Sequence, residues 1–413
     1  MGRKKNTFVL FCISLRFVIV FATSLLLGGC NAKNPKADTD IVYEIDFEQC
    51  LSTERQMFLS EIADSLAYIE LKAPDDIIIT GIRNVISYNN CLLICHREGV
   101  SLFHQDGRFI RNIGAKGQGP GEYMNVTGIA VDTKREEILV GSMTKFLFYD
   151  FEGVVLRSIP HTLYLNFLGG ITDSIIWLDD QFATNNEKYK AFAIPTNGKL
   201  DTLAFIPNEN YGMTISGRQG RSGSSSTQFY YQYNNDLYFK GNLYNDMIWR
   251  LSGLNPVPYA SINMGKYKMP VEYQSWFSAD EYERNSDRYR GVAAVLEDDR
   301  YFFLYSHSYE IQVSEFTRTY TDAAYMVFDK KNQKGFTTRD RNGTGLIDDI
   351  LKGPPIWPRW ISEDYYFHAI EAYQLLEIIE AGDYQPAAPL KDLLSRINED
   401  TNQLLIMFRK KKQ

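Results

Sequence analysis

The sequence predicts an all-β fold in which short antiparallel sheets repeat along the chain. Three observations support this prediction: an internal repeat of apolar segments, turns made of an acidic residue and glycine between them, and scarce helical periodicity over most of the 413 residues. Short apolar runs bounded by turn residues are typical of β-strands. We therefore expect one repetitive β-structure rather than several domains of different class.

The repeat is clearest between two consecutive copies, residues 92–113 and residues 138–159. Apolar, acidic, glycine and arginine residues match between them at a constant offset of 46 residues. An Asp-Gly pair at residues 106–107 corresponds to a Glu-Gly pair at residues 152–153. Glycine adopts the positive φ that a tight hairpin turn needs, so both pairs predict a hairpin.

Fainter copies extend the repeat through the turn glycines Gly198 and Gly253 and through residues 323–338. A unit of about 45 residues with four short strands is typical of a β-propeller blade. Residues from about 81 to about 380 have room for six such units. The sequence therefore predicts a six-bladed β-propeller.

The ends of the chain are expected to close this ring. Propellers avoid exposed sheet edges by completing one blade with strands from both ends. Residues 41–47 alternate as a strand does, and residues 403–408 are an apolar run, so either segment is a candidate closing strand. Residues 390–398 are the clearest helical segment.

The first residues resemble an export signal rather than part of the fold. Basic residues near the N-terminus precede an apolar run at residues 17–27. A spanning helix would place Arg16 in the hydrocarbon, at a cost of about 2.5–3.5 kcal/mol. We therefore expect three regions: a lipoprotein signal peptide (1–29), a tether (30–40) and the six-bladed propeller (41–413).

The residues that end the signal resemble a bacterial lipobox. In the sequence Leu27-Gly28-Gly29-Cys30, the thiol of Cys30 would be acylated and become the first mature residue. The alternative is an incidental cysteine behind a secretory signal. Asn31 stands where an inner-membrane retention aspartate would, which favours an outer-membrane anchor facing the periplasm or the cell surface.

The charge of the chain excludes two classes of partner. The net charge is −7, and removal of the signal, whose only charged residues are basic, makes the mature chain more acidic. An acidic chain without a basic stripe suits neither nucleic acid nor anionic lipid headgroups.

The mature chain has three cysteines besides Cys30. Cys91 and Cys95 lie in one predicted strand about 13 Å apart, too far for a disulfide, so buried thiols are expected. A bridge from Cys50 to one of them is left open.

The glycine-rich segment at residues 114–123, GAKGQGPGEY, raises the question of a phosphate site. Phosphate loops place glycine amides before a helix N-terminus. In this chain β-branched residues follow, with no P-loop or dinucleotide-binding spacing. We expect a connector between two blades, the second beginning near Gly128; a ligand-contacting rim loop is the alternative.

Several segments carry a family resemblance. Residues 59–71, 106–123 and 244–251 and the C-terminal strand resemble the six-bladed β-propeller lipoproteins of Bacteroides-type bacteria. The resemblance covers nearly the whole mature chain, and the GxxGxGPGEY loop is its most specific part. It implies a cell-envelope location and NHL-like repeats, and it carries no catalytic motif. Asn402-Gln403 departs from the usual Asn-Pro.

No local motif indicates catalysis. The five histidines show neither zinc spacing nor a nucleophile partner. A propeller enzyme would instead gather acids from several blades at the channel mouth. The aspartates near strand ends are Asp132, Asp179, Asp180, Asp298 and Asp299. They are candidate calcium ligands or ordinary turn residues, and no cofactor other than calcium is indicated.

Two segments are candidate binding surfaces. Residues 353–360, GPPIWPRW, include Trp357, Arg359 and Trp360, which could stack on sugars or on a partner if exposed, or form core if buried between blades. Residues 216–227 form a basic, glycine- and serine-rich stretch that is either a binding loop or an insertion.

The leading hypothesis is a non-catalytic envelope lipoprotein whose propeller binds a glycan, a peptide or a protein. The alternatives are a metal-dependent hydrolase or lyase with its site at the channel mouth, and a scaffold without a small ligand. A binder is expected to expose aromatic residues around the mouth, whereas a metal enzyme needs converging carboxylates.

Overall fold

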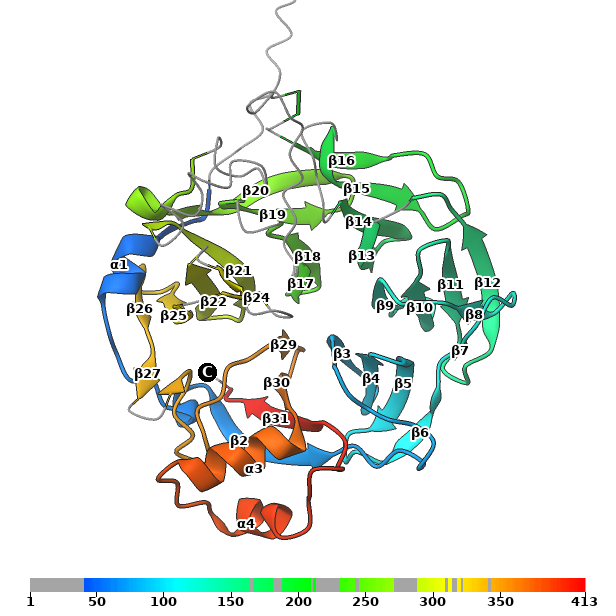
Figure 1. Ribbon diagram of the computed structural model, residues 1–413. Helices are drawn as coiled ribbons and strands as arrows, with labels where there is room; N and C mark the ends of the chain where they lie inside the picture. Colours follow the sequence, from blue (N-terminus) through cyan, green and yellow to red (C-terminus); the bar gives the residue numbers. More distant parts are fainter. Residues whose placement is uncertain are drawn as a thin grey trace, which may run out of the picture. The chain divides into compact units, whose positions relative to one another are not determined.

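The strands of the structure, a computed structural model, form a ring of six blades around a central channel (Figure 1), which confirms the predicted fold class. The chain from Asp40 onward is one unit. The structure describes residues 41–163, 166–180, 188–208, 211–212, 230–241, 245–270, 288–308, 311–313, 318–320, 322–340 and 343–412.

Each blade is built on four antiparallel strands, which follow one another from the channel outward. Blade 1 consists of β3 (Asn84–Tyr88), β4 (Cys91–His96), β5 (Gly99–His104) and β6 (Phe109–Asn112); blade 2 of β9 (Gly128–Asp132), β10 (Glu137–Gly141), β11 (Lys145–Tyr149) and β12 (Val155–Pro160); blade 3 of β13 (Asn166–Thr172), β14 (Ile175–Asp180), β15 (Tyr189–Pro195) and β16 (Ala204–Pro207). Blade 4 consists of β17 (Tyr230–Tyr233), β18 (Asp236–Phe239), β19 (Met247–Ser252) and β20 (Asn255–Asn263); blade 5 of β21 (Arg290–Glu297), β22 (Tyr301–Ser308), β25 (Ala324–Asp329) and β26 (Lys334–Thr337); blade 6 of β29 (Trp360–Ile361), β30 (Tyr365–Ile370), β31 (Leu404–Lys410) and β2 (Ala63–Glu70).

Short elements decorate the ring. The two-stranded pairs are β7 (Ala115–Lys116) with β8 (Glu122–Tyr123), β23 (Ile311–Val313) with β24 (Arg318–Tyr320), and β27 (Arg339–Asp340) with β28 (Gly343–Thr344). The helical elements described are α1 (Phe47–Ser52), η1 (Leu59–Glu61), η2 (Gly265–Tyr267), α3 (Ala372–Ala381) and α4 (Ala388–Leu394).

The sequence repeat corresponds to the second, third and fourth strands of a blade. The predicted hairpin glycines Gly107 and Gly153 link the third and fourth strands of blades 1 and 2 with φ of +86° and +77°. Gly198 and Gly253 occupy the same turn in blades 3 and 4. The constant register therefore arises because one apolar strand pattern faces both neighbouring blades in each copy.

The ring closes in blade 6, which combines both ends of the chain. β31, formed by the predicted C-terminal segment, lies between β30 and the N-terminal strand β2 and is antiparallel to both. The other candidate, residues 41–47, contains β1 (Tyr43–Asp46), but β1 adds to the outer edge of blade 4 as a parallel fifth strand. The N-terminal half of the closure is thus made by a later segment than expected.

Both C-terminal helices lie between β30 and β31 in the chain. α4 overlaps the predicted helix at residues 390–398 but begins and ends earlier. α3 was not predicted. α3 is an insertion within a blade, and a repeat-based assignment has no counterpart for it in the other blades.

The glycine-rich segment connects β6 of blade 1 to β9 of blade 2, as predicted. Its backbone is held by side chains of the two blades. Lys145 Nζ donates to the carbonyl oxygen of Gly119 at 2.6 Å, and Tyr149 Oη donates to that of Gly121 at 3.0 Å. Tyr123 Oη accepts from the Val100 amide at 3.1 Å and donates to the carbonyl of Ile113 at 2.9 Å.

Tyr123→Phe is therefore expected to lower the free energy of unfolding by about 1–3 kcal/mol, because the substitution leaves a buried amide and a buried carbonyl without their partner. Urea unfolding of the variant measures this loss. Tyr211→Phe is the matched control, since Tyr211 is 49% exposed. Equal midpoints for Tyr123→Phe and the wild type would contradict the expectation.

The cysteines of the described chain are free thiols. Cys91 and Cys95 lie in the same strand, β4, as predicted, and Cys50 and Cys95 are buried. Burial raises the pKa of the Cys95 thiol to about 11, so this sulfur is uncharged at neutral pH.

Candidate functional site

The candidate site lies at the end of the channel where the innermost strands begin, which we call the N-terminal mouth. In several blades, residues next to the first pair between the innermost and the second strand lie there. Arg83 precedes the pair Asn84–Cys95, and its amide donates to the carbonyl of Cys95 at 2.8 Å. Arg359 precedes the pair Trp360–Phe367, and its amide donates to the carbonyl of Phe367 at 2.8 Å.

The described residues at or next to the starts of these strand pairs are polar. Directly before the innermost strands they are Arg83, Thr127 and Arg359 of blades 1, 2 and 6, whereas in blade 5 Arg290 is the first residue of the innermost strand itself. On the second strands they are His96, Ser142, Lys240 and His368 of blades 1, 2, 4 and 6, each directly after the paired residue, and in blade 5 Ser308, which pairs with Arg290. None of these nine residues is acidic. Blade 3 differs, because its equivalent residues are not among those described and Asp180 directly precedes one of them.

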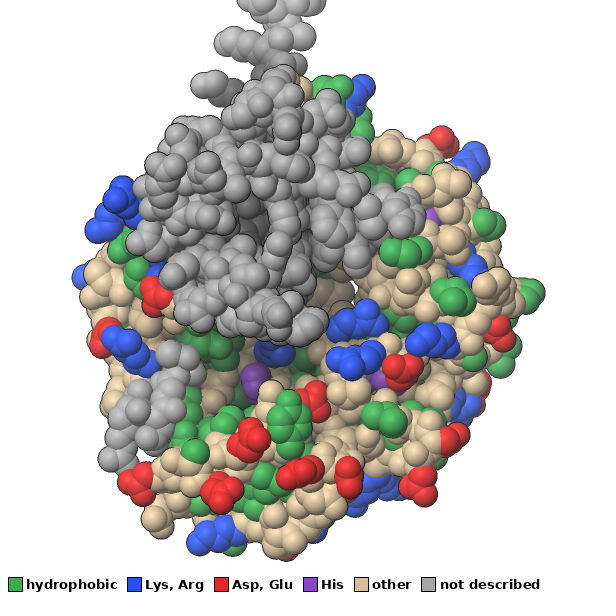
Figure 2. All heavy atoms as spheres, viewed as in Figure 1, with side chains coloured by type: hydrophobic (Ala, Val, Ile, Leu, Met, Phe, Trp, Pro, Cys, Tyr) green, Lys and Arg blue, Asp and Glu red, His purple; other side chains and the backbone are tan. Residues whose placement is uncertain are grey.

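Arginines therefore begin the innermost strands of three consecutive blades, 5, 6 and 1. β29 of blade 6 contacts both β21 and β3, so the three arginines follow one arc of the ring. Figure 2 shows Lys and Arg side chains beside the opening at the centre of this face. This local excess of positive charge stands out in a chain whose net charge is −7.

Two of these arginines are exposed and have no acidic partner in the described part of the chain. The guanidinium of Arg83 donates to the carbonyl oxygens of Val126 at 3.2 Å and His96 at 2.9 Å. The guanidinium of Arg359 makes no hydrogen bond or ion pair within the described chain. Arg359 is therefore available to an anion from solution, and Arg83 can add a charge-assisted contact.

The third arginine belongs to a buried cationic group between blades 4 and 5. Arg290 is 5% exposed and pairs with Asp322. The neighbouring Lys240 is buried, and its Nζ donates to the carbonyl of Val292 at 2.5 Å. Burial lowers the pKa of Lys240 to about 7, since the charged form loses hydration.

The histidines beside the exposed arginines are neutral at pH 7. Burial, and secondly the charge of Arg83, lowers the pKa of His96 to about 4. Burial, and secondly the charge of Arg359, lowers the pKa of His368 to about 3. In each pair a permanent cation therefore stands beside an uncharged imidazole.

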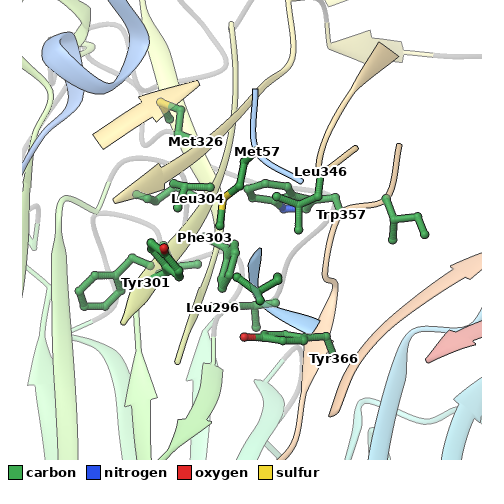
Figure 3. Packing of buried hydrophobic residues seen from close by; sticks show 14 of the residues in the cluster. Met57, Leu296, Tyr301, Phe303, Leu304, Met326, Leu346, Trp357 and Tyr366 are labelled. Atoms are coloured by element: carbon green, nitrogen blue, oxygen red, sulfur yellow. The ribbon is translucent and has the colours of Figure 1, made fainter. Parts of the chain in front are cut away.

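The three residues predicted as a candidate binding surface, Trp357, Arg359 and Trp360, differ in their burial. Trp357 is 7% exposed and packs against Phe303 and Tyr325 of blade 5, with ring centroids 5.7 Å and 5.0 Å away (Figure 3). Trp360 is 5% exposed, and its Nε1 donates to the carbonyl of Arg83 at 3.2 Å. Both indoles therefore form core, the second of the two interpretations, whereas Arg359 points its unpaired guanidinium outward.

The candidate calcium ligands serve mainly as turn residues where their contacts are described. Asp132 Oδ1 accepts from the amides of Lys134 and Arg135, both at 3.1 Å. Asp298 Oδ1 accepts from the Arg300 and Tyr301 amides at 2.7 Å and 2.5 Å. Within the described part of the chain, no three His, Cys, Asp or Glu side chains are placed to hold a metal ion.

Two predicted features lie outside the described residues, Cys30 and the basic stretch at residues 216–227. None of the helices described is long and apolar enough to cross a membrane.

The sequence analysis missed Arg83, His96 and His368. Each arginine directly precedes the first residue of an innermost strand. That first residue pairs with a residue of the second strand, and the histidine directly follows this partner. The number of residues between arginine and histidine differs between blades because the turns differ in length. Alignment of the blades by strand start, rather than by constant spacing, would have found both pairs.

The ring of six blades, each built on four strands, defines a protein of the six-bladed β-propeller class. Within this class the chain belongs to the family described as Domain of unknown function (DUF4934), which matches residues 42–409. No curated protein matches the sequence.

Among the solved structures compared, one with a TM-score above 0.5 shares the fold. The chain is similar to a Bacteroides fragilis protein described as exported, with 18% identity and a TM-score of 0.67 over 90% of this chain and 99% of that one. Similarity to BamB of Moraxella catarrhalis is lower, with 9% identity and a TM-score of 0.41 over 84% and 99% of the two chains. The WD40 domain of Neurospora crassa Pan2 has 12% identity and a TM-score of 0.37 over 68% and 73%.

Proposed function

We propose that this protein is an exported propeller of the cell envelope whose function is non-catalytic ligand binding at the N-terminal mouth. The observation that carries the proposal is the arc of arginines on blades 5, 6 and 1, in which Arg83 and Arg359 lack an acidic partner among the residues that the structure describes. Keeping such charges adjacent costs electrostatic repulsion, and a bound ligand that neutralises them would relieve it. A glycan, a peptide and a partner protein are the ligand classes considered.

Binding to panels of envelope glycans and peptides tests the proposal, with the double variant Arg83→Gln, Arg359→Gln as the diagnostic protein. We expect the wild-type mature chain to bind at least one ligand, and the double variant to lose about tenfold or more in affinity, since a hydrogen bond to a charged group contributes about 1.5–3 kcal/mol.

The matched control is Arg108→Gln, Arg409→Gln. Both arginines are exposed and form surface ion pairs with Asp106 and Asp64 elsewhere on the ring. This control is expected to bind like the wild type. Equal affinity of the diagnostic variant and the wild type for every ligand bound would place binding elsewhere and contradict the proposal.

The proposal includes an outer-membrane lipid anchor on Cys30, with the propeller facing the periplasm or the cell surface and its blades related to NHL-like repeats. The lipobox-like residues before Cys30 support the anchor. Two or more acyl chains hold a protein stably in a bilayer. Labelled fatty acid is expected to enter the wild type and not Cys30→Ser, and an unlabelled wild type found in the soluble fraction would contradict the anchor.

The alternative of a metal-dependent hydrolase or lyase, with calcium at the channel mouth, is favoured by no contact among the described residues. At the opposite ends of the innermost strands, Asp132 and Asp298 accept hydrogen bonds from turn amides. Glu297 pairs with Lys330.

A further inference from the structure

The two exposed arginines of the N-terminal mouth belong to a repeated arginine–histidine pair. In blades 1 and 6 the amide of the arginine donates at 2.8 Å to the carbonyl of the residue that precedes the histidine. Trp360 Nε1 of blade 6 donates to the carbonyl of Arg83 in blade 1, so the two pairs are fixed relative to one another. We call them the blade 1 pair (Arg83, His96) and the blade 6 pair (Arg359, His368).

The hydrogen bonds of His96 determine its tautomer. Ser101 Oγ has one proton, which it donates to Asn112 Oδ1 at 2.8 Å. The contact of 2.9 Å between Ser101 Oγ and His96 Nε2 is therefore donated by the imidazole. Since the ring is neutral, Nδ1 carries a lone pair, and this atom is buried without a hydrogen-bond partner.

His368 likewise has a buried ring nitrogen without a hydrogen-bond partner, Nδ1. Burial lowers the pKa of this imidazole, and the backbone of Trp357 opposes that lowering only in part, so the ring is neutral at pH 7. Each pair thus combines a fork of cationic donors with one unsatisfied nitrogen of a neutral imidazole.

A buried acceptor without a partner costs about 1–3 kcal/mol. A fully deprotonated anion such as sulfate would pair with the guanidinium but offer no proton to Nδ1, and a neutral sugar would do the reverse. A uronic acid carries a carboxylate and neighbouring hydroxyl groups on one ring, so it can satisfy both groups. Two adjacent pairs suit a chain of such sugars.

We propose, on the basis of the proposed function, that the blade 6 pair and the blade 1 pair bind an acidic polysaccharide, with sugar carboxylates on the arginines and sugar hydroxyls donating to the histidine Nδ1 atoms. Solvent does not reach either Nδ1 in the unliganded ring, so binding includes a local rearrangement that uncovers these atoms. Arg359 is exposed and unpaired, and its rotamer can change at little cost.

Calorimetric titration of the mature wild-type chain with three probes tests this inference. The probes are an oligogalacturonate, its methyl ester and an oligoacrylate; the ester lacks the charge, and the acrylate lacks the hydroxyls. We expect the oligogalacturonate to bind more tightly than either of the others. Equal binding of the acrylate would overturn the sugar assignment, and equal binding of the ester would overturn the role of the carboxylate.

Two variants assign the contacts. Arg359→Gln is expected to weaken oligogalacturonate binding about 10- to 100-fold and to leave ester binding unchanged. His368→Gln has no counterpart of Nδ1, and is expected to weaken oligogalacturonate binding about fivefold without affecting the acrylate.

Arg108→Gln, Arg409→Gln is again the control, and thermal melting establishes that each variant is folded. Unchanged oligogalacturonate affinity in both diagnostic variants would overturn this inference. If only neutral glycans or peptides bind, and the double variant Arg83→Gln, Arg359→Gln weakens them, the acidic-sugar inference fails while the proposed function stands. If no ligand of any class depends on these arginines, both fail.

Discussion

Deletion of residues 404–413 is expected to abolish cooperative folding of the propeller. These residues contain β31, the central connection of blade 6, which pairs with β30 on one side and with β2 on the other. Leu404, Leu405 and Phe408 are fully buried. Each such side chain contributes about 1.5–3 kcal/mol through burial. Their sum, with two lost strand ladders, approaches or exceeds the total stability of about 5–15 kcal/mol typical of a folded protein.

The measurement is far-UV circular dichroism during heating, together with size-exclusion chromatography. Deletion of residues 412–413 is the control, because Lys412 follows the closing strand and is exposed. A cooperative transition of the long deletion at the wild-type temperature would contradict closure by β31. Stability of the ring would then rest on the neighbouring blades alone.

The same strand illustrates what could be predicted from the sequence. Residues 404–408 are apolar at consecutive positions, as expected of a strand covered on both faces, and the ring needs such a strand at its seam. The blades with strong repeats were predictable for a related reason: each buries the same strand pattern against two neighbours. Gly107 and Gly153 mark their turns because a residue with positive φ is needed there.

The arginine–histidine pairs could not be predicted in this way. Arg359 was singled out only through the unusual tryptophans beside it, and both of these proved to be core. Its relation to His368 arises from cross-strand register, which turn lengths conceal in the sequence. The tautomer of His96 depends further on Ser101 and Asn112 from the next two strands. Such sites are three-dimensional properties of the blade edges and have no local spacing.

The second large effect concerns a buried ion pair of blade 5 whose carboxylate accepts hydrogen bonds from blade 4. Glu297, at the end of β21, is 0% exposed, and Lys330 Nζ lies 2.8 Å from its Oε1. Tyr259 Oη donates to Oε1 at 2.6 Å and Tyr231 Oη donates to Oε2 at 2.9 Å, both from blade 4. The carboxylate is thus satisfied only while its partners from both blades are present.

Lys330→Met is expected to destabilise the fold by about 3–5 kcal/mol at neutral pH, because removal of one partner leaves the other charge buried without compensation. Urea unfolding of the variant and the wild type measures the loss. The double variant Glu297→Gln, Lys330→Met is the control. It has no buried charge at this site and is expected to recover much of the stability, since the amide oxygen can accept from one tyrosine and the amide nitrogen can donate to the hydroxyl oxygen of the other.

The loss should also depend on pH, with a defined sign. Burial raises the pKa of Glu297, and Lys330 is the largest influence that lowers it again. Without Lys330 this pKa rises further in the folded state, while the unfolded chain keeps the usual value of about 4.3. Between these two values the folded state binds more protons, so the stability of Lys330→Met falls as the pH rises. The difference in the free energy of unfolding between Lys330→Met and the wild type is therefore expected to be small near pH 4 and largest near pH 8. A difference that stays constant across this range would show that Glu297 does not ionise alone in the core.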